Sequence, residues 1–215
     1  MTSRRRVSGW MLATLSVVSI LMLRLPPVSG QSEISTDASA AGRRSESLDP
    51  PCFDNGRRYA DCGNGTITDS ATGLIWLKDA GCLGSRDWAA ANRAAAALRQ
   101  GRCRLSDGSK PGDWRLPTNA EWNATVATAR SHPLLLCTNP ALTDDTGAAC
   151  FGTGGGSSFR NVSIDGYWSS TTSSQAAGLL PDGTKAGTLS LSNGLLLSFF
   201  DKSCCPQRVW PVRAH

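Results

Sequence analysis

The stretch that decides the fold reads WRLPTNAEW and occupies residues 114–122. Thr118 and Glu121 have the spacing of a capping box, in which each side chain binds the backbone amide of the other residue at the start of a helix. Pro117 stands before the cap, so the chain enters the helix from an extended segment. The pattern predicts a helix over residues 119–130.

A second helix is predicted over residues 87–98, where apolar positions recur at helical spacing. These positions are Trp88, Ala91, Ala95 and Leu98. Alanine is the best helix former, and a face rich in alanine permits close packing against a sheet. Gly101 follows the segment and is expected to end it.

Two short strands are predicted before this helix, at residues 65–69 and 73–77. The polar connection between them suits a β-hairpin. Side chains alternate along a strand, so Ile67, Leu74 and Trp76 are expected to share the buried face.

Strand patterns return after the helices. Three segments are β-prone: residues 167–171, 188–191 and 195–199. Asn193-Gly194 is the preferred centre of a tight hairpin turn and joins the last two. Residues 208–213 supply a final strand, in which Pro211 favours an edge or a strand end. The order of strands, two helices and strands predicts an α+β domain with an antiparallel sheet.

The region between the second predicted helix and the next strand, residues 136–161, has the composition of a long loop. Its glycine-rich run at residues 152–156 lacks the preceding strand and following helix of a phosphate-binding loop, so a phosphate site is disfavoured. Asp144 and Asp145 could bind Ca²⁺ together with Asn161 and backbone carbonyls. Solvated loop acids are the more common reading of such a pair.

The cysteines form an even set of eight, and all of them follow an apparent export signal. This combination predicts an oxidising compartment and a disulfide framework. Spacing favours three local bridges, each worth roughly 3 kcal/mol through restriction of the unfolded chain. They are Cys52 with Cys62, Cys82 with Cys103, and Cys137 with Cys150. Other connectivities stay open.

Cys204 and Cys205 are left over by this pairing. They could form a vicinal ring, remain free, or bridge to other cysteines. A strained, exposed bridge is more easily reduced and can be redox-active, although a structural use is the favoured reading. Zinc is disfavoured because no two closely spaced CxxC units occur and the chain has 2 histidines.

The N-terminus has the layout of a secretory signal, with three arginines, an apolar run over residues 10–23 and small residues up to Gly30. We predict a signal peptide at residues 1–30, a flexible linker at residues 31–50 and one domain at residues 51–215. An uncleaved anchor is the alternative, but the run falls short of the roughly 20 residues of a spanning helix. The localisation is therefore expected to be periplasmic, secreted or at the cell surface, with no membrane span after cleavage.

The net charge of +5 comes mostly from the signal region. Four of the 22 basic residues lie within residues 1–30, so 18 basic and 17 acidic residues remain downstream. A nucleic-acid partner is disfavoured because such binders carry a basic excess on one face. Local clusters persist at Arg57-Arg58 and at Arg99, Arg102 and Arg104, where solvated surface is the favoured reading.

Catalytic residues are not predicted. His132 lies at a predicted helix end and His215 is the last residue, so no Ser-His-Asp arrangement can be argued. No cofactor is expected.

Taken together, these segments resemble the Lcl C-terminal domain family of bacterial exported proteins. The matching pieces follow the order of that family over roughly residues 52–213: CFDN at 52–55, YADCGNGT at 59–66, TGLIW at 72–76, WRLPT at 114–118, YWSST at 167–171 and VWPVR at 209–213. The resemblance implies a C-type-lectin-like fold and, for the collagen-linked adhesin that names the family, binding of sulfated polysaccharides. This chain lacks a collagen-like Gly-X-Y repeat, so the oligomeric adhesin architecture does not carry over.

With that resemblance, the leading hypothesis is an exported, disulfide-stapled binding module without catalysis, which recognises extracellular glycans or mediates adhesion. Lectin-like folds place recognition on long loops, so the candidate ligand-binding residues are Asp144, Asp145, Arg160 and Asn161. The sugar-coordinating Glu-Pro-Asn and Trp-Asn-Asp tripeptides of calcium-dependent lectins are missing, so a metal is not expected.

Two alternatives remain. WRLPT with Glu121-Trp122 also looks like a motif of formylglycine-generating enzymes, which suggests a redox enzyme or thiol oxidase using Cys204 and Cys205. Adjacent thiols do not match the spaced cysteine pair of those enzymes. The other alternative is a structural envelope protein that binds another protein.

Overall fold

The computed structural model describes residues 52–54, 56–131, 136–173 and 183–215. These residues belong to one compact unit, Arg44–His215. The predicted signal peptide and linker lie outside the described residues. The elements are β1 (Tyr59–Asp61), β2 (Thr66–Asp69), β3 (Leu74–Leu77), β4 (Ser85–Arg86), α1 (Trp88–Ala96), α2 (Asn119–Ser131), β5 (Gly166–Thr172), β6 (Lys185–Ser190), β7 (Leu195–Asp201), β8 (Gln207–Arg208) and β9 (Val212–Arg213).

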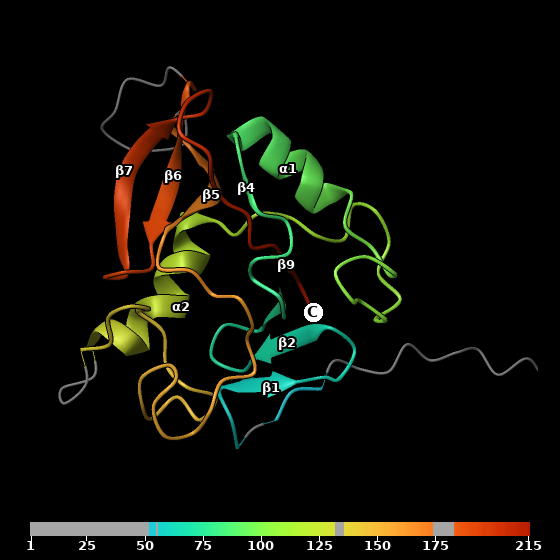
Figure 1. The fold of residues 1–215 in the computed structure, drawn as a ribbon, viewed down its shortest axis with the longest axis vertical. Coiled ribbons are helices and arrows are strands. Elements are labelled where there is room, and N and C mark those ends of the chain that lie inside the picture. The colour runs from blue at the N-terminus through green and yellow to red at the C-terminus, as the bar shows by residue number, and fades with distance from the viewer. Residues whose placement is uncertain (1–51, 55, 132–135, 174–182) are drawn as a thin grey trace, which may run out of the picture. The chain divides into compact units, whose positions relative to one another are not determined.

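The first sheet is antiparallel and has the order β1-β2-β3-β9 (Figure 1). It contains the predicted β2–β3 hairpin, in which Ile67 lies opposite Trp76. The expected burial of Ile67, Leu74 and Trp76 is confirmed, but every other residue of these two strands is buried as well. Alternation therefore does not separate a core face from a solvent face here, because other elements cover both.

The second sheet has the order β4-β8-β5-β6-β7. Its strands pair antiparallel except for β5 and β8, which run parallel with Tyr167 opposite Arg208. The α+β class is thus confirmed, while the expectation of a purely antiparallel sheet is wrong for this pair. The parallel pair arises because the chain after β7 crosses over to the far side of β5 before it enters β8.

The β6–β7 hairpin is present, but its turn is longer than predicted. Ser190 lies opposite Leu195, so four residues, Leu191–Gly194, form the connection. The Gly194 amide donates to the Ser190 carbonyl at 2.8 Å, and Gly194 has a φ of 70°, which glycine adopts without strain. Asn193-Gly194 therefore ends a four-residue turn and is not the centre of a two-residue one.

The predicted final strand is two short strands in different sheets. β8 belongs to the second sheet and β9 to the first, and Pro211 lies between them. The Pro211 carbonyl accepts a hydrogen bond from the Leu77 amide at 3.2 Å, although proline itself cannot donate to a ladder. The segment 207–213 therefore links the two sheets.

The predicted capping box is present, and the other helix has a cap that was not predicted. At α2, the Glu121 amide donates to the Thr118 hydroxyl at 3.1 Å and the Thr118 amide donates to Glu121 Oε2 at 2.7 Å, which is the capping box. Arg115 adds a two-pronged ion pair to the same carboxylate, at 2.6 and 2.8 Å. At α1, Asp87 caps the Ala90 amide at 2.7 Å, and the helix ends at Ala96, before the predicted end.

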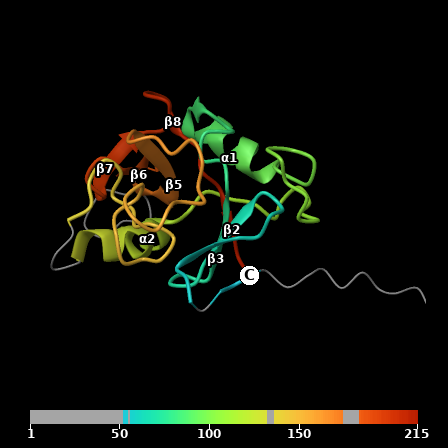
Figure 2. The same cartoon turned by 60° about the horizontal axis from the view of Figure 1, so that its bottom comes forward.

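The helices cover opposite faces of β5, because neighbouring strand residues point to opposite sides. Tyr167 packs in the larger core cluster with Trp122 and Val126 of α2. Trp168 packs in a smaller cluster with Ala91 and Ala95 of α1. Figure 2 shows the two helices apart from one another beside the sheet.

Aromatic side chains dominate the larger cluster. Trp210 lies at its centre, with ring centroids 5.0 Å from Trp76, 5.6 Å from Tyr167 and 4.9 Å from Phe159. The indole nitrogen of Trp210 donates to the Leu77 carbonyl at 2.7 Å, so its polar atom is satisfied in the core.

Four disulfides staple the unit. The structure contains the three local bridges expected from spacing, Cys52–Cys62, Cys82–Cys103 and Cys137–Cys150, and a vicinal bridge, Cys204–Cys205. Within the described ranges, none of the helices has the length and apolar character needed to cross a bilayer.

Replacing the central indole tests this arrangement. Trp210→Ala is expected to lower the free energy of unfolding by about 3–5 kcal/mol, because it leaves a cavity and an unpaired carbonyl in the core. The measurement is urea denaturation with the disulfides intact. Leu197→Ala, at a side chain that is 38% exposed, is the control and should change stability by no more than about 0.5 kcal/mol. Equal losses for the two variants would contradict the central role of Trp210.

Candidate functional site

The predicted ligand residue Asp144 lies inside the long loop and is buried. Its carboxylate accepts five hydrogen bonds, from the backbone amides of Gly147, Ala149 and Gly155 and from the amide and hydroxyl of Thr146. Burial raises the pKa of this carboxyl, but the hydrogen bonds lower it by more, so its pKa lies below the ordinary value. Asp144 holds the loop together.

Asp145 is also buried and faces the protein. Its carboxylate accepts the amide of Ser158 at 2.9 Å and the hydroxyl of the same residue at 2.6 Å. Its carbonyl accepts the amides of Arg58 and Tyr59, which fastens the loop to β1. Both acids of the pair therefore make structural contacts within the protein, and the described residues contain no group of three or more histidine, cysteine and acidic side chains that could hold a metal ion.

Arg160 and Asn161 lie at the end of the loop, away from that pair's hydrogen-bond network. The backbone of Arg160 pairs with the segment after β3: its amide donates to the Lys78 carbonyl, and its carbonyl accepts from Ala80, both at 2.9 Å. The Asn161 side chain donates to Asp79 Oδ1 at 2.9 Å. The structure thus fixes Arg160 beside Lys78 and uses Asn161 as a brace.

Arg160 lines a cleft of about 150 Å³, which we call the basic cleft. Its lining residues are Gly63, Gly65, Lys78, Asp79, Cys103, Arg104 and Arg160. Three separate segments supply the cations, since Lys78 follows β3, Arg104 lies in the loop after α1, and Arg160 ends the long loop.

Two glycines allow these segments to meet. A Cβ on Gly65 would lie 2.5 Å from the Arg104 carbonyl oxygen, and Gly65 has a φ of 88°. A Cβ on Gly81 would lie 2.9 Å from the Cβ of Asn161. Both contacts are closer than a side chain permits, so the arginine-bearing backbones can approach only at glycine.

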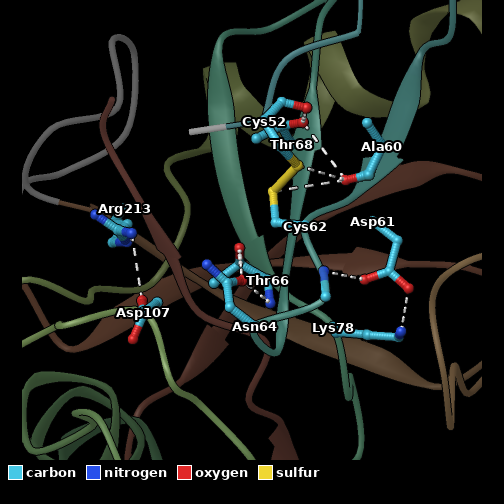
Figure 3. Close-up of a disulfide and its surroundings, with 11 residues drawn as sticks. Cys52, Ala60, Asp61, Cys62, Asn64, Thr66, Thr68, Lys78, Asp107 and Arg213 are labelled. Carbon is cyan, nitrogen blue, oxygen red and sulfur yellow. Dashed lines mark hydrogen bonds and ion pairs between the residues drawn. A yellow bond between two sulfur atoms is a disulfide. The ribbon is translucent and has the colours of Figure 1, made fainter. Parts of the chain in front are cut away.

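The charges of the basic cleft are not fully neutralised inside the protein. Lys78 forms an ion pair with Asp61 at the rim, shown in Figure 3. Burial raises the pKa of Asp61, but the hydrogen bonds from Lys78 and Gly63 and the charges of Lys78 and Arg160 lower it by more, so Asp61 stays ionised.

The two arginines, in contrast, form no ion pair with any described residue, and both are exposed. Asp79, the acid in the lining, accepts neutral amides from Asn161 and Gly81. Three cations against Asp61 and Asp79 leave a net charge of +1, with two guanidinium groups available to an outside anion. Arg104 belongs to a basic cluster visible in the sequence, whereas nothing in the sequence singles out Lys78.

Other reactive groups lie elsewhere. His215 packs against Phe53 with ring centroids 5.3 Å apart, and His132 is outside the described residues. Cys204 and Cys205 are exposed in the turn between β7 and β8 and line neither of the two described cavities.

Comparison with known proteins gives one match. A family model described as the Lcl C-terminal domain matches residues 65–213. No curated protein matches the chain, and no solved structure matches it.

The role of Asp144 predicts a stability effect that depends on pH. Asp144→Asn is expected to lower the free energy of unfolding by about 2–3 kcal/mol at pH 7. The asparagine side chain has an NH2 group in place of one carboxylate oxygen, and this group cannot accept the hydrogen bonds made there. The pKa of Asp144 is lowered by folding, so its stabilisation is present above about pH 4 and is lost as the pH falls through the folded value. Urea denaturation at neutral and acidic pH should show the two proteins converging in acid. Asp54→Asn, at an exposed carboxylate, is the control; a pH-independent gap would contradict the assignment.

The close approach at Gly65 predicts a second effect. Gly63 and Gly65 both have positive φ, at 72° and 88°, but a Cβ on Gly63 meets nothing within 4 Å. Gly65→Ala should therefore destabilise the protein by about 1–3 kcal/mol more than Gly63→Ala, because only Gly65→Ala adds a clash. Denaturation of the two variants side by side measures this difference. Equal costs would mean that only backbone conformation matters at Gly65.

Proposed function

Because the chain belongs to the Lcl C-terminal domain family, we propose that it is an exported, non-catalytic module that binds extracellular polysaccharide carrying anionic groups. The observation that carries the proposal is the basic cleft, where Arg104 and Arg160 are exposed and neither forms an ion pair with a described residue. A sulfate or carboxylate group attached to a sugar is an anion of suitable size and charge for this cleft.

Two further features support the proposed compartment and the proposed fold of the domain. Four disulfides pin short elements and long loops, which suits an oxidising compartment outside the cytoplasm. The α+β arrangement with a long loop over residues 136–161 agrees with the C-type-lectin-like fold that we propose for the domain. Binding then resides at the end of that loop, at Arg160, and not at its acidic pair.

Binding assays with matched ligands test the proposal. The purified protein is expected to bind a sulfated polysaccharide and to lose most of that affinity when the polysaccharide is desulfated. Binding should also weaken between about 50 mM and about 200 mM salt, because ion release drives association with polyanions.

Variants then locate the site. Arg104→Gln with Arg160→Gln should lower affinity about 5-fold or more, since each removes an exposed charge contact. Arg57→Gln with Arg130→Gln is the control, because both residues are exposed and line neither described cavity. If the protein binds neither neutral nor sulfated sugars at either salt concentration, the proposal is wrong.

A second candidate function is thiol–disulfide exchange at Cys204–Cys205. The observation that favours it is that both members of a vicinal bridge are exposed, so a thiolate can reach either sulfur. An exported dithiol protein would attack one sulfur, release the other as a thiolate, and then resolve the mixed disulfide with its second thiol.

Thiol titration separates the candidates. Exchange predicts that mild treatment with a dithiol releases two thiols, and that the double variant Cys204→Ser with Cys205→Ser releases none under the same treatment. Eight cysteines that stay oxidised and unreactive under the same treatment would count against it.

A further inference from the structure

A second cavity is lined in part by the same loop that carries Arg104. It measures about 110 Å³ and is lined by Leu83, Arg86, Ala94, Ala97, Leu98, Arg99 and Arg102. We call it the arginine groove. Its floor is formed by apolar side chains of α1 and its neighbours, and no acidic residue is among its lining residues.

The rim of the arginine groove holds three arginines, all of them exposed. Arg86 Nε donates to the Leu83 carbonyl at 3.0 Å, which fixes that side chain against the groove. Arg99 makes a longer contact, at 3.4 Å, with the Ala97 carbonyl. None of the three forms an ion pair with a described residue, so the groove combines an apolar surface with unneutralised positive charge.

This combination selects for one kind of ligand. A hydrated anion alone would gain nothing from the apolar floor, and an uncharged hydrocarbon would leave the arginines unused. A sugar ring presents a face of C–H groups with anionic substituents around its edge. Such a ring can lie on Leu83, Ala94 and Ala97 while its anionic groups contact the arginines.

The groove and the basic cleft are joined by three consecutive residues. Arg102 lines the groove, whereas Cys103 and Arg104 line the cleft. Cys103 and Arg104 both have left-handed backbone, with φ of 50° and 64°, so the chain turns sharply at this point. Non-glycine residues hold such a conformation only where their surroundings fix it.

Those surroundings are covalent and hydrogen-bonded. The Cys82–Cys103 bridge ties the turn to the residue before Leu83, which lines the groove. The Leu105 amide donates to the Arg102 carbonyl, and the Gly101 amide to the Leu105 carbonyl, each at 2.8 Å. The turn, which we call the ridge, is therefore held in place at the point where the lining residues of the two cavities adjoin in the chain.

We propose that the arginine groove and the basic cleft are two subsites of one extended site for a linear anionic polysaccharide, which crosses the ridge at residues 102–104. This inference rests on the proposed function. An anionic substituent of one sugar occupies the basic cleft, and a ring further along the same chain lies in the arginine groove. A ligand too short to cross the ridge reaches one subsite at a time.

Ligand length is the decisive variable. The affinity of the purified protein is measured for a sulfated oligosaccharide series, from disaccharide to dodecasaccharide, at constant salt. Affinity should rise steeply once the chain spans both subsites, because the second contact becomes intramolecular, and should then level off.

Three pairs of variants assign the subsites. Arg99→Gln with Arg102→Gln should lower the affinity for the longest ligands about 5- to 20-fold and leave disaccharide binding in the basic cleft unchanged. It should also reduce the slope of log affinity against log salt by about two for long ligands, one for each charge removed. Arg104→Gln with Arg160→Gln should weaken ligands of every length, and Arg57→Gln with Arg130→Gln should weaken none.

The outcomes separate the two proposals. An affinity that does not rise with length, or a long-ligand affinity that is the same in Arg99→Gln with Arg102→Gln as in the control pair, overturns the two-subsite arrangement while the basic cleft stands. No binding at any length overturns the proposed function itself. Circular dichroism of each variant must match the parent, which these exposed positions favour.

Discussion

The packing of Trp210 against the rest of the aromatic cluster is the interaction on which this structure depends. The ring contacts side chains from the first sheet, from α2, from β5 and from the long loop, and its nitrogen bonds to β3. Because β8 and β9 lie on either side of it in the chain and in different sheets, the same residue that fills the core also joins the two sheets. Its burial positions the loops whose ends form the basic cleft.

Local signals determined how much of the fold the sequence could predict. The capping box at Thr118 and the hairpin before α1 depend on residues within a few positions of one another, and both were predictable. The split of residues 208–213 was not, because it depends on which strand each half meets after the chain has collapsed. The burial of both faces of β2 and β3 was missed for the same reason, since the covering elements come from distant parts of the sequence.

The candidate site was harder to predict from the sequence than the fold was. Arg160, named from the sequence because it ends a long loop, lines the basic cleft, whereas Asp144 and Asp145 make hydrogen bonds within that loop. Lys78 and Arg104 meet Arg160 only because Gly65 and Gly81 permit close backbone contacts, and such contacts leave no pattern of spacing in the sequence. The loop acids looked like ligands because a sequence does not reveal how many backbone amides a carboxylate will meet.

The position of β9 has a consequence for the order in which the molecule can be assembled. Val212 pairs with Trp76, so a strand near the end of the polypeptide completes a sheet that begins near residue 59. A ribosome-bound chain that lacks these last residues would leave the tryptophans of β3 and α2 without their covering indole. Closure of the first sheet and of the aromatic core therefore depends on contacts between residues more than 130 positions apart in the chain.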